Sequence, residues 1–208
     1  MDWLQILQIF TLVTGVIYMI MQIVQHKLMW YFNIMTASGA LVAAMTLRVD
    51  GVWSPLWAQV ALNSYFLTMS FVGIVQWKKL KGARDEKLTT VRLGKGILLA
   101  GIAIVLIGAP VIWKLLTFTS DRYPLMDAIS LSFSAVAAWW LTRKHAEEWY
   151  CWIIADILVV IMYAMAASWW MMLLYVAYTV SSVAGLIHWK KKGVVIDVPG
   201  PGSRNVRD

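Results

Sequence analysis

The residues best suited to bind a ligand lie close together in one apolar stretch of the second half of the chain. Trp149, Trp152 and Asp156 are spaced i, i+3, i+7, which places them on one face of a helix. Two indole rings and a carboxylate on one face suit a flat, cationic, aromatic ligand, because rings stack and a cation is attracted to both kinds of group. The alternative is that the tryptophans form an interfacial belt and Asp156 bonds to a neighbouring helix.

Further polar and aromatic side chains occur in other apolar stretches. Asn63 and Ser70 are spaced i, i+7, and Asn33 follows an aromatic run that begins at Trp30. Polar residues of this kind either line a path or bond helices to one another. With two tyrosines that either line the path or pack, the candidate substrate-binding residues are Trp30, Asn33, Asn63, Ser70, Trp149, Trp152, Asp156, Tyr175 and Tyr178.

The composition requires that these stretches lie in a membrane. Of the 208 residues, 61% are hydrophobic and 14% are charged, and the mean hydropathy is +0.68. A soluble domain has about 45–50% apolar and about 25% charged residues, and a water-soluble chain of this length cannot bury so much apolar surface. We therefore predict an all-α integral membrane protein. The net charge of +7 is attributed to basic loops rather than to nucleic-acid binding.

Charged residues and prolines divide the chain into seven predicted transmembrane helices. Each is close to the length of about 20 residues that a helix needs to cross a bilayer. They comprise residues 3–24, 28–47, 56–77, 96–116, 125–141, 149–167 and 169–188. The last two meet at Ser168 with almost no loop. The tail, residues 193–208, contains Pro199-Gly200-Pro201-Gly202 and is predicted to be flexible.

The basic residues predict an N-terminus outside the membrane and a cytoplasmic C-terminus. With seven spans in this orientation, only Arg48, Lys114 and Arg122 of the 18 Lys and Arg residues lie on the outer side. An excess of basic residues in cytoplasmic loops is the general rule. The first apolar stretch has no basic flank before it and no small-residue cleavage site, so we interpret it as a span rather than a signal peptide.

The two halves of the chain carry similar short patterns. Residues 73–79 and 185–191 both follow the pattern Gly-x-x-x-Trp-Lys-Lys, and aromatic runs begin at Trp30 and Trp149. We interpret residues 1–77 and 125–192 as two three-helix repeats, joined by residues 78–124, a cytoplasmic loop plus a linker helix. One linker span makes the repeats parallel, an arrangement of transporters with a central path. Chance similarity is the alternative, because Trp and Lys recur at membrane interfaces.

The sequence contains few features that would indicate an enzyme. The chain has no G-x-x-x-x-G-K-[ST] loop and no G-x-S-x-G motif. The single cysteine, Cys151, excludes a multi-cysteine metal site, and Asp127 and Asp156 start near opposite membrane faces and make a poor acid–base pair. Glu147 and Glu148 suit the N-terminus of the predicted helix that follows them. We therefore expect a transporter without cofactor or metal, with an intramembrane enzyme or a structural membrane protein as the alternatives.

One stretch of the chain resembles the PnuC-type vitamin transporters. It runs Pro124-x-x-Asp127, then Ser134, then Thr142-Arg143-Lys144-x-x-Glu147-x-Trp149-x-x-Trp152-x-x-x-Asp156. The first half supports the likeness with Asn63, Ser70 and Gly73-x-x-x-Trp77, and the likeness covers residues 3 to about 192. The W-x-x-W element after T-R-K-x-x-E is the specific part.

The resemblance implies a fold of three plus one plus three helices, similar to a full-length SWEET transporter. It implies uptake of a water-soluble vitamin across the bacterial inner membrane by facilitated diffusion. A cytoplasmic kinase then traps the substrate by phosphorylation, and some members look trimeric. The chain departs from the family at two positions. Some nicotinamide riboside transporters of the family carry Asn in place of Asp156, and several members carry Gln in place of Asn63.

Charge narrows the choice of vitamin among those that the family takes. Nicotinamide riboside and thiamine carry a fixed positive charge on an aromatic ring, whereas riboflavin does not. An aspartate beside two tryptophans favours the cationic pair. We therefore expect nicotinamide riboside, the usual substrate of the family, with thiamine as the second candidate and riboflavin as the third.

Overall fold

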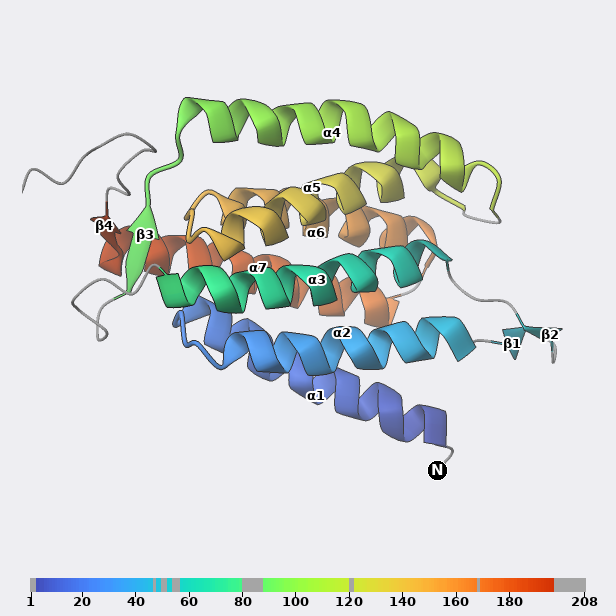
Figure 1. The fold of residues 1–208 in the computed structure, drawn as a ribbon. Coiled ribbons are helices and arrows are strands. Elements are labelled where there is room, and N and C mark those ends of the chain that lie inside the picture. Colours follow the sequence, from blue (N-terminus) through green and yellow to red (C-terminus); the bar gives the residue numbers. More distant parts are fainter. Residues whose placement is uncertain are drawn as a thin grey trace, which may run out of the picture.

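The computed structural model describes residues 3–46, 48–49, 52–53, 57–79, 88–119, 122–167 and 169–196. Seven long helices lie side by side in it (Figure 1). They are α1 (Trp3–Ile23), α2 (Met29–Thr46), α3 (Trp57–Lys79), α4 (Lys95–Leu116), α5 (Pro124–Thr142), α6 (Glu148–Met165) and α7 (Trp169–Lys192). Every predicted span is therefore a helix. The largest difference lies at the end of α7, which continues through three lysines beyond its predicted last residue.

Two pairs of short strands lie at opposite ends of the helices (Figure 1). β1 (Arg48–Val49) and β2 (Val52–Trp53) form an antiparallel pair between α2 and α3, whereas β3 (Thr89–Val91) pairs in parallel with β4 (Val194–Ile196). The tail expected to be flexible thus begins with a strand, because Val194 N–H donates to the Leu88 carbonyl at 2.8 Å and brings the chain beside β3. Residues 197–208, the charged residues 80–87 and Ser168 lie outside the described part of the chain.

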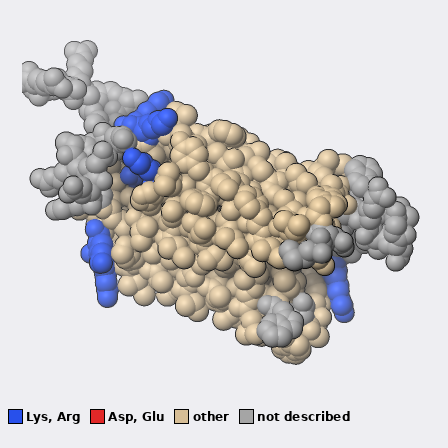
Figure 2. Space-filling view, turned by 90° about the horizontal axis from the view of Figure 1, so that it is seen from below, with Lys and Arg blue, Asp and Glu red and all other residues tan. Residues whose placement is uncertain are grey.

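The helices have the surface of a protein that lies in a bilayer. Among the described residues, all helices except α2 are long and apolar enough to cross a membrane, and Leu106 and Ile107 of α4 are 69% and 66% exposed. In Figure 2, Lys and Arg lie at the ends of the molecule and the surface between them is uncharged. An apolar middle between charged ends fits the hydrocarbon core of a membrane.

Six of the helices form a closed ring. α1, α2 and α3 contact one another in sequence order, as do α5, α6 and α7. α3 also contacts α5, and α1 contacts α7, whereas α4 packs on α5 (Figure 1). We call the boundary between the group α1–α3 and the group α5–α7, where α3 meets α5 and α1 meets α7, the seam. Side chains that face the inside of the ring can therefore meet side chains of the other group across the seam.

A tryptophan lying over a glycine holds α2 against α3. Trp30 at the start of α2 covers Gly73, where an added side chain would overlap the indole ring. The edge of the ring also meets Trp77, with ring centroids 5.3 Å apart and planes at 85°. Edge-to-face contacts of this kind suit the charge distribution of aromatic rings, and small residues let membrane helices approach closely.

The same arrangement holds α6 against α7. Trp149 covers Gly185 and meets the edge of Trp189, with ring centroids 5.6 Å apart and planes at 85°. The Gly-x-x-x-Trp pattern found in the sequence is therefore a packing motif. Its glycine admits an indole from the preceding helix, and its tryptophan, one turn later, supports the edge of that indole.

We expect Gly185→Ala to destabilise the protein. A methyl group at this position would collide with Trp149, and overpacking a well-packed site costs about 1–3 kcal/mol. The Tm of the detergent-purified protein, followed by tryptophan fluorescence, should fall by several degrees. Gly96→Ala in α4 is the matched control, because nothing lies within 4 Å of its added carbon; equal Tm values for both variants and the wild type would contradict the packing motif.

Candidate functional site

Each group of three helices buries one hydrogen-bonded polar pair. In the first group, Asn33 donates to the Ser70 hydroxyl at 2.8 Å, and in the second, Ser182 donates to the Asp156 carboxylate at 3.2 Å. Both serines are buried, and both occupy the same position relative to the Gly-x-x-x-Trp motif. The structure therefore brings two predicted site residues, Asn33 and Ser70, together, and it joins Asp156 to a serine that the sequence analysis did not select.

An aromatic pair crosses the seam. Trp152 of α6 faces Phe66 of α3 with ring centroids 6.0 Å apart and planes at 58°, and Tyr65 beside it donates to the Ala135 carbonyl of α5 at 2.9 Å. The indole nitrogen of Trp152 is buried and has no hydrogen-bond partner among the described residues. A buried donor without an acceptor costs about 1–3 kcal/mol, so this group is one that a ligand oxygen would stabilise.

Three tyrosines lie together on α6 and α7. The rings of Tyr163 and Tyr175 are 5.5 Å apart between centroids, and those of Tyr175 and Tyr178 are 5.4 Å apart. Asp156 bonds to Ser182, which lies one turn after Tyr178 on α7. The predicted site residues Tyr175 and Tyr178 thus lie on the helix that bonds Asp156, and Tyr163 joins the two tyrosines.

The remaining predicted site residues have other surroundings. Trp149 is 2% exposed and Trp30 is equally buried. Each indole ring packs over a glycine of the following helix, as described above. Asn63 is buried and donates to the Gln59 carbonyl of its own helix at 2.8 Å. Trp152, one turn after Trp149, also packs against the buried cluster that contains Trp149, whereas Asp156 is bonded to Ser182.

Two indole hydrogen bonds close the seam at the lysine-rich end, where α3 and α7 end in lysines. Trp77 of α3 donates to the Leu141 carbonyl of α5 at 3.2 Å, and Trp189 of α7 donates to the Ile23 carbonyl of α1 at 2.9 Å. Each tryptophan reaches from its own group to the last turn of the first helix of the other group. We call these two bonds the tryptophan clasp.

Strand β3 also joins the two groups at the lysine-rich end. Gln25, after α1, makes two hydrogen bonds to the Thr89 main chain, at 2.7 and 3.0 Å, and Lys144, after α5, donates to the Thr89 hydroxyl at 2.9 Å. Gln25 and Lys144 both have a left-handed main chain, with φ of 57° and 59°, which costs a non-glycine residue about 1–2 kcal/mol. The same strained turn thus ends the first helix of each group, and one residue of β3 bonds to both turns.

His145 is buried beside this strand. Its Nδ1 lies 2.9 Å from the Val91 carbonyl and must donate to it, and Nε2 has no partner in the described part of the chain. Burial lowers the pKa of His145 below its usual value, because the charged imidazole loses its hydration. The Val91 carbonyl and Glu147 act in the opposite direction, and Arg143 lowers the pKa further.

Glu148 is the candidate that the sequence analysis missed. The side chain is 0% exposed, and its Oε1 accepts a hydrogen bond from Gln22 of α1 at 3.4 Å. Its Oε2 is buried without a partner among the described residues. In the sequence, a glutamate at the start of a helix is also typical of a solvent-exposed residue that interacts favourably with the helix dipole. The one sequence feature that could have indicated its burial is its position directly before Trp149.

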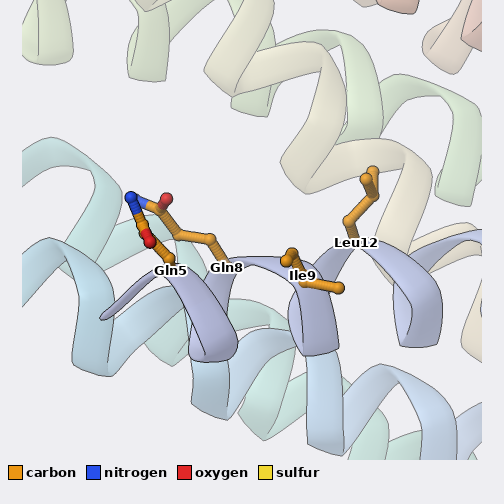
Figure 3. A pocket seen from close by; sticks show the side chains of 4 residues that line it. All are labelled: Gln5, Gln8, Ile9 and Leu12. Atoms are coloured by element: carbon orange, nitrogen blue, oxygen red, sulfur yellow. The ribbon is translucent and has the colours of Figure 1, made fainter. Parts of the chain in front are cut away.

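The end of the molecule opposite the lysine-rich end carries an open hollow. Gln5, Gln8, Ile9 and Leu12 of α1 line it, and their side chains point to the same side of the helix (Figure 3). Two amides and two aliphatic side chains make this surface partly polar. All four lining residues are exposed and belong to the first half of α1.

The comparison with protein families identifies the chain. A family model described as nicotinamide mononucleotide transporter matches residues 5–191. The chain belongs to this family. Its relatives are transporters rather than enzymes, which is the class that the sequence favoured.

Curated relatives and a solved structure agree with this assignment. The nicotinamide riboside transporter PnuC of Neisseria mucosa is 27% identical over 147 residues, 65% of this chain and 56% of the relative. The PnuC protein of Escherichia coli is 30% identical over 69 residues, 33% of this chain and 29% of the relative. The chain thus spans about half or less of the curated relatives it matches. A crystal structure of the vitamin B3 transporter PnuC has a TM-score of 0.66 and 24% identity, covering 89% of this chain and 80% of that chain, which shows a shared fold.

We expect acid to destabilise the protein through His145. Because burial lowers the pKa of this residue, its contribution to stability is present above the unfolded pKa of about 6.5 and is lost as the pH falls below that value. Between pH 7.5 and 5.5 the wild-type Tm should therefore fall by several degrees more than that of His145→Asn, which keeps a donor for Val91. His26→Asn, at an exposed position, is the control and should behave as the wild type; an equal fall in all three proteins would contradict the argument.

Proposed function

We propose that this chain carries nicotinamide riboside across the bacterial inner membrane by facilitated diffusion along the seam. The observation that supports this most is the placement of Trp152 and Asp156 on α6. The indole faces Phe66 across the seam, and its N–H has no hydrogen-bond partner among the described residues. The buried Asp156 carboxylate accepts a hydrogen bond from Ser182. An indole and a carboxylate suit a cationic aromatic ring, and the family supplies the vitamin class.

We further propose that the helices form two parallel repeats in a three plus one plus three arrangement, as in a full-length SWEET transporter. Residues 1–77 would form the first repeat, 78–124 the loop and linker helix α4, and 125–192 the second repeat. Three features recur in both: the tryptophan over glycine, the buried serine pair and the left-handed turn. Crossing of the membrane by α2 as a seventh span is part of this proposal.

The proposed binding site draws on both repeats. Trp152 stacks on the vitamin ring and Asp156 lies beside its charge, while Asn33, Ser70 and Asn63 supply polar groups for the ribose hydroxyls from the first repeat. Tyr175 and Tyr178 line the path next to Asp156. Trp30 and Trp149, which the sequence analysis included, support the site by packing rather than by contact with the ligand.

Different observations favour the two cationic vitamins. Nicotinamide riboside is favoured by the names of the curated relatives. Thiamine is the second candidate because some nicotinamide riboside transporters of the family carry Asn in place of Asp156. The full negative charge of an aspartate suits either cationic ring. Riboflavin has no fixed charge for Asp156 to attract.

The proposed transport needs no energy source within the chain. Net uptake would depend on a cytoplasmic kinase that phosphorylates the vitamin and traps it. The lysine-rich end would face the cytoplasm, by the rule that basic residues gather there, so that the hollow lined by Gln5 and Gln8 would face outside. A homotrimer is the proposed assembly.

Counterflow in proteoliposomes tests the function. Vesicles loaded with unlabelled nicotinamide riboside should transiently accumulate the labelled vitamin without ATP, a proton gradient or a sodium gradient. Calorimetry with nicotinamide riboside, thiamine and riboflavin on the purified protein then identifies the vitamin. Conversion of the substrate would indicate an enzyme, no movement of any vitamin would indicate a structural protein, and accumulation driven by an ion gradient alone would exclude facilitated diffusion.

We predict that Trp152→Ala weakens vitamin binding by about one to two orders of magnitude. Stacking on an aromatic side chain contributes roughly 1–3 kcal/mol per base in nucleic-acid binders, which corresponds to this loss in Kd. Calorimetry measures the affinity, and size exclusion checks that the variant runs as one peak. Trp149→Ala is the matched comparison and should instead lower the Tm; wild-type affinity in Trp152→Ala would remove this residue from the site.

The charge of Asp156 should distinguish a cationic ring from a neutral one. Coulomb attraction at about 4 Å is about 4 kcal/mol at an effective dielectric constant of 20, and desolvation of the carboxylate offsets part of it. Asp156→Asn should therefore weaken a cationic vitamin by roughly tenfold and leave an analogue with carbon in place of the ring nitrogen nearly unchanged. Equal losses for both ligands would mean that Asp156 acts through hydrogen bonds, and no loss would mean that it lies away from the path.

A further inference from the structure

The structure contains a second buried carboxylate that the proposed site does not use. Glu148 is the first residue of α6 and lies at the lysine-rich end of the molecule, where it is 0% exposed. Only one of its oxygens is bonded among the described residues, and that bond, from Gln22 of α1, is long at 3.4 Å. An ionisable side chain is costly in a membrane helix unless it is paired or faces a polar path. A single weak hydrogen bond to a neutral amide offsets little of that cost.

The fold itself does not require an acidic residue at this position. In the first group of helices, Met29 stands directly before Trp30, just as Glu148 stands directly before Trp149. Met29 is likewise 0% exposed. The same packing environment therefore accepts an apolar side chain. A carboxylate there carries a cost that packing does not explain.

Glu148 also lies between the two groups of helices. Its partner Gln22 belongs to the other group of helices, so the bond between them crosses the seam. It does so beside the tryptophan clasp, since Trp189 bonds to Ile23, the neighbour of Gln22. Opening of the lysine-rich end must separate these groups, which would leave the Glu148 carboxylate facing the opened path. Asp156 lies two turns further along the same helix, at about 1.5 Å of rise per residue.

We propose that Glu148 is a second cation-binding position, which takes over the charged ring of the substrate from Asp156 as the lysine-rich end opens. The inference rests on the proposed function and adds a position to the exit half of the path. Its ligand class is the cationic ring of the same substrate, because the position offers one buried carboxylate with an oxygen that no described residue bonds. While the seam is closed, Gln22 holds one oxygen; when it opens, the cation replaces Gln22.

The test compares Glu148→Gln and Glu148→Met with the wild type in counterflow. Glu148→Gln keeps a partner for Gln22 without the charge, and Glu148→Met is the residue that already fills the matching place in the first group. Both should fold, and both should bind external nicotinamide riboside within twofold of the wild-type Kd, since Asp156 is intact. Counterflow of nicotinamide riboside should slow by about tenfold, while that of its neutral ring-carbon analogue should change by less than twofold.

Glu147→Gln is the matched control, because it removes a charge from the adjacent half-buried residue and should leave both rates within twofold of the wild type. An unchanged rate for nicotinamide riboside in Glu148→Gln would overturn the proposal. Equal slowing of both substrates would also overturn it, since Glu148 would then only latch the helices. If the wild type itself moved none of the vitamins, the proposed function would fail as well, and that result differs from either of the others.

Discussion

Two indole N–H groups fix the closed end of this molecule, and much of the remaining structure depends on them. Trp77 and Trp189 each support the edge of a second indole within their own group of helices. Each also donates a hydrogen bond across the seam to the first helix of the other group. The same side chains therefore order the helices inside each group and join the two groups. Because both bonds lie at the lysine-rich end, the seam is held there while polar groups remain along its length.

The two groups of helices share their packing but differ in charge. The glycine–tryptophan contacts and the buried serines recur in both, whereas the buried carboxylates of the described residues, Asp156 and Glu148, both lie on α6. A membrane interior tolerates such groups only where they are bonded or line a polar path. The shared packing gives the protein its architecture, and under the proposed function the unshared charges would give one side of the seam its preference for a cation. Transport is thus assigned to the features by which the two groups differ.

Much of the fold follows from the sequence because a bilayer imposes simple rules. Long apolar runs between charges predict the helices, and the recurring Gly-x-x-x-Trp pattern predicts two similar halves. Side-chain roles are harder to predict, because one residue type serves several purposes in a membrane. Trp149 and Trp152 share a helical face, yet the first is buried over Gly185 and the second faces Phe66 across the seam. Glu148 has the sequence context of a surface charge, and only the position of α1 reveals its burial.

A reversible lock across the lysine-rich end tests the central claim that substrate passes along the seam. Gln25 and Lys144, which end the first helix of each group and both bond to Thr89, are replaced by cysteine in a chain with Cys151→Ser. A reducible crosslinker then joins the two turns in proteoliposomes. Counterflow of nicotinamide riboside should stop on crosslinking and return when the linker is reduced, while binding of external vitamin persists. Counterflow at the same rate before and after reduction would contradict the account.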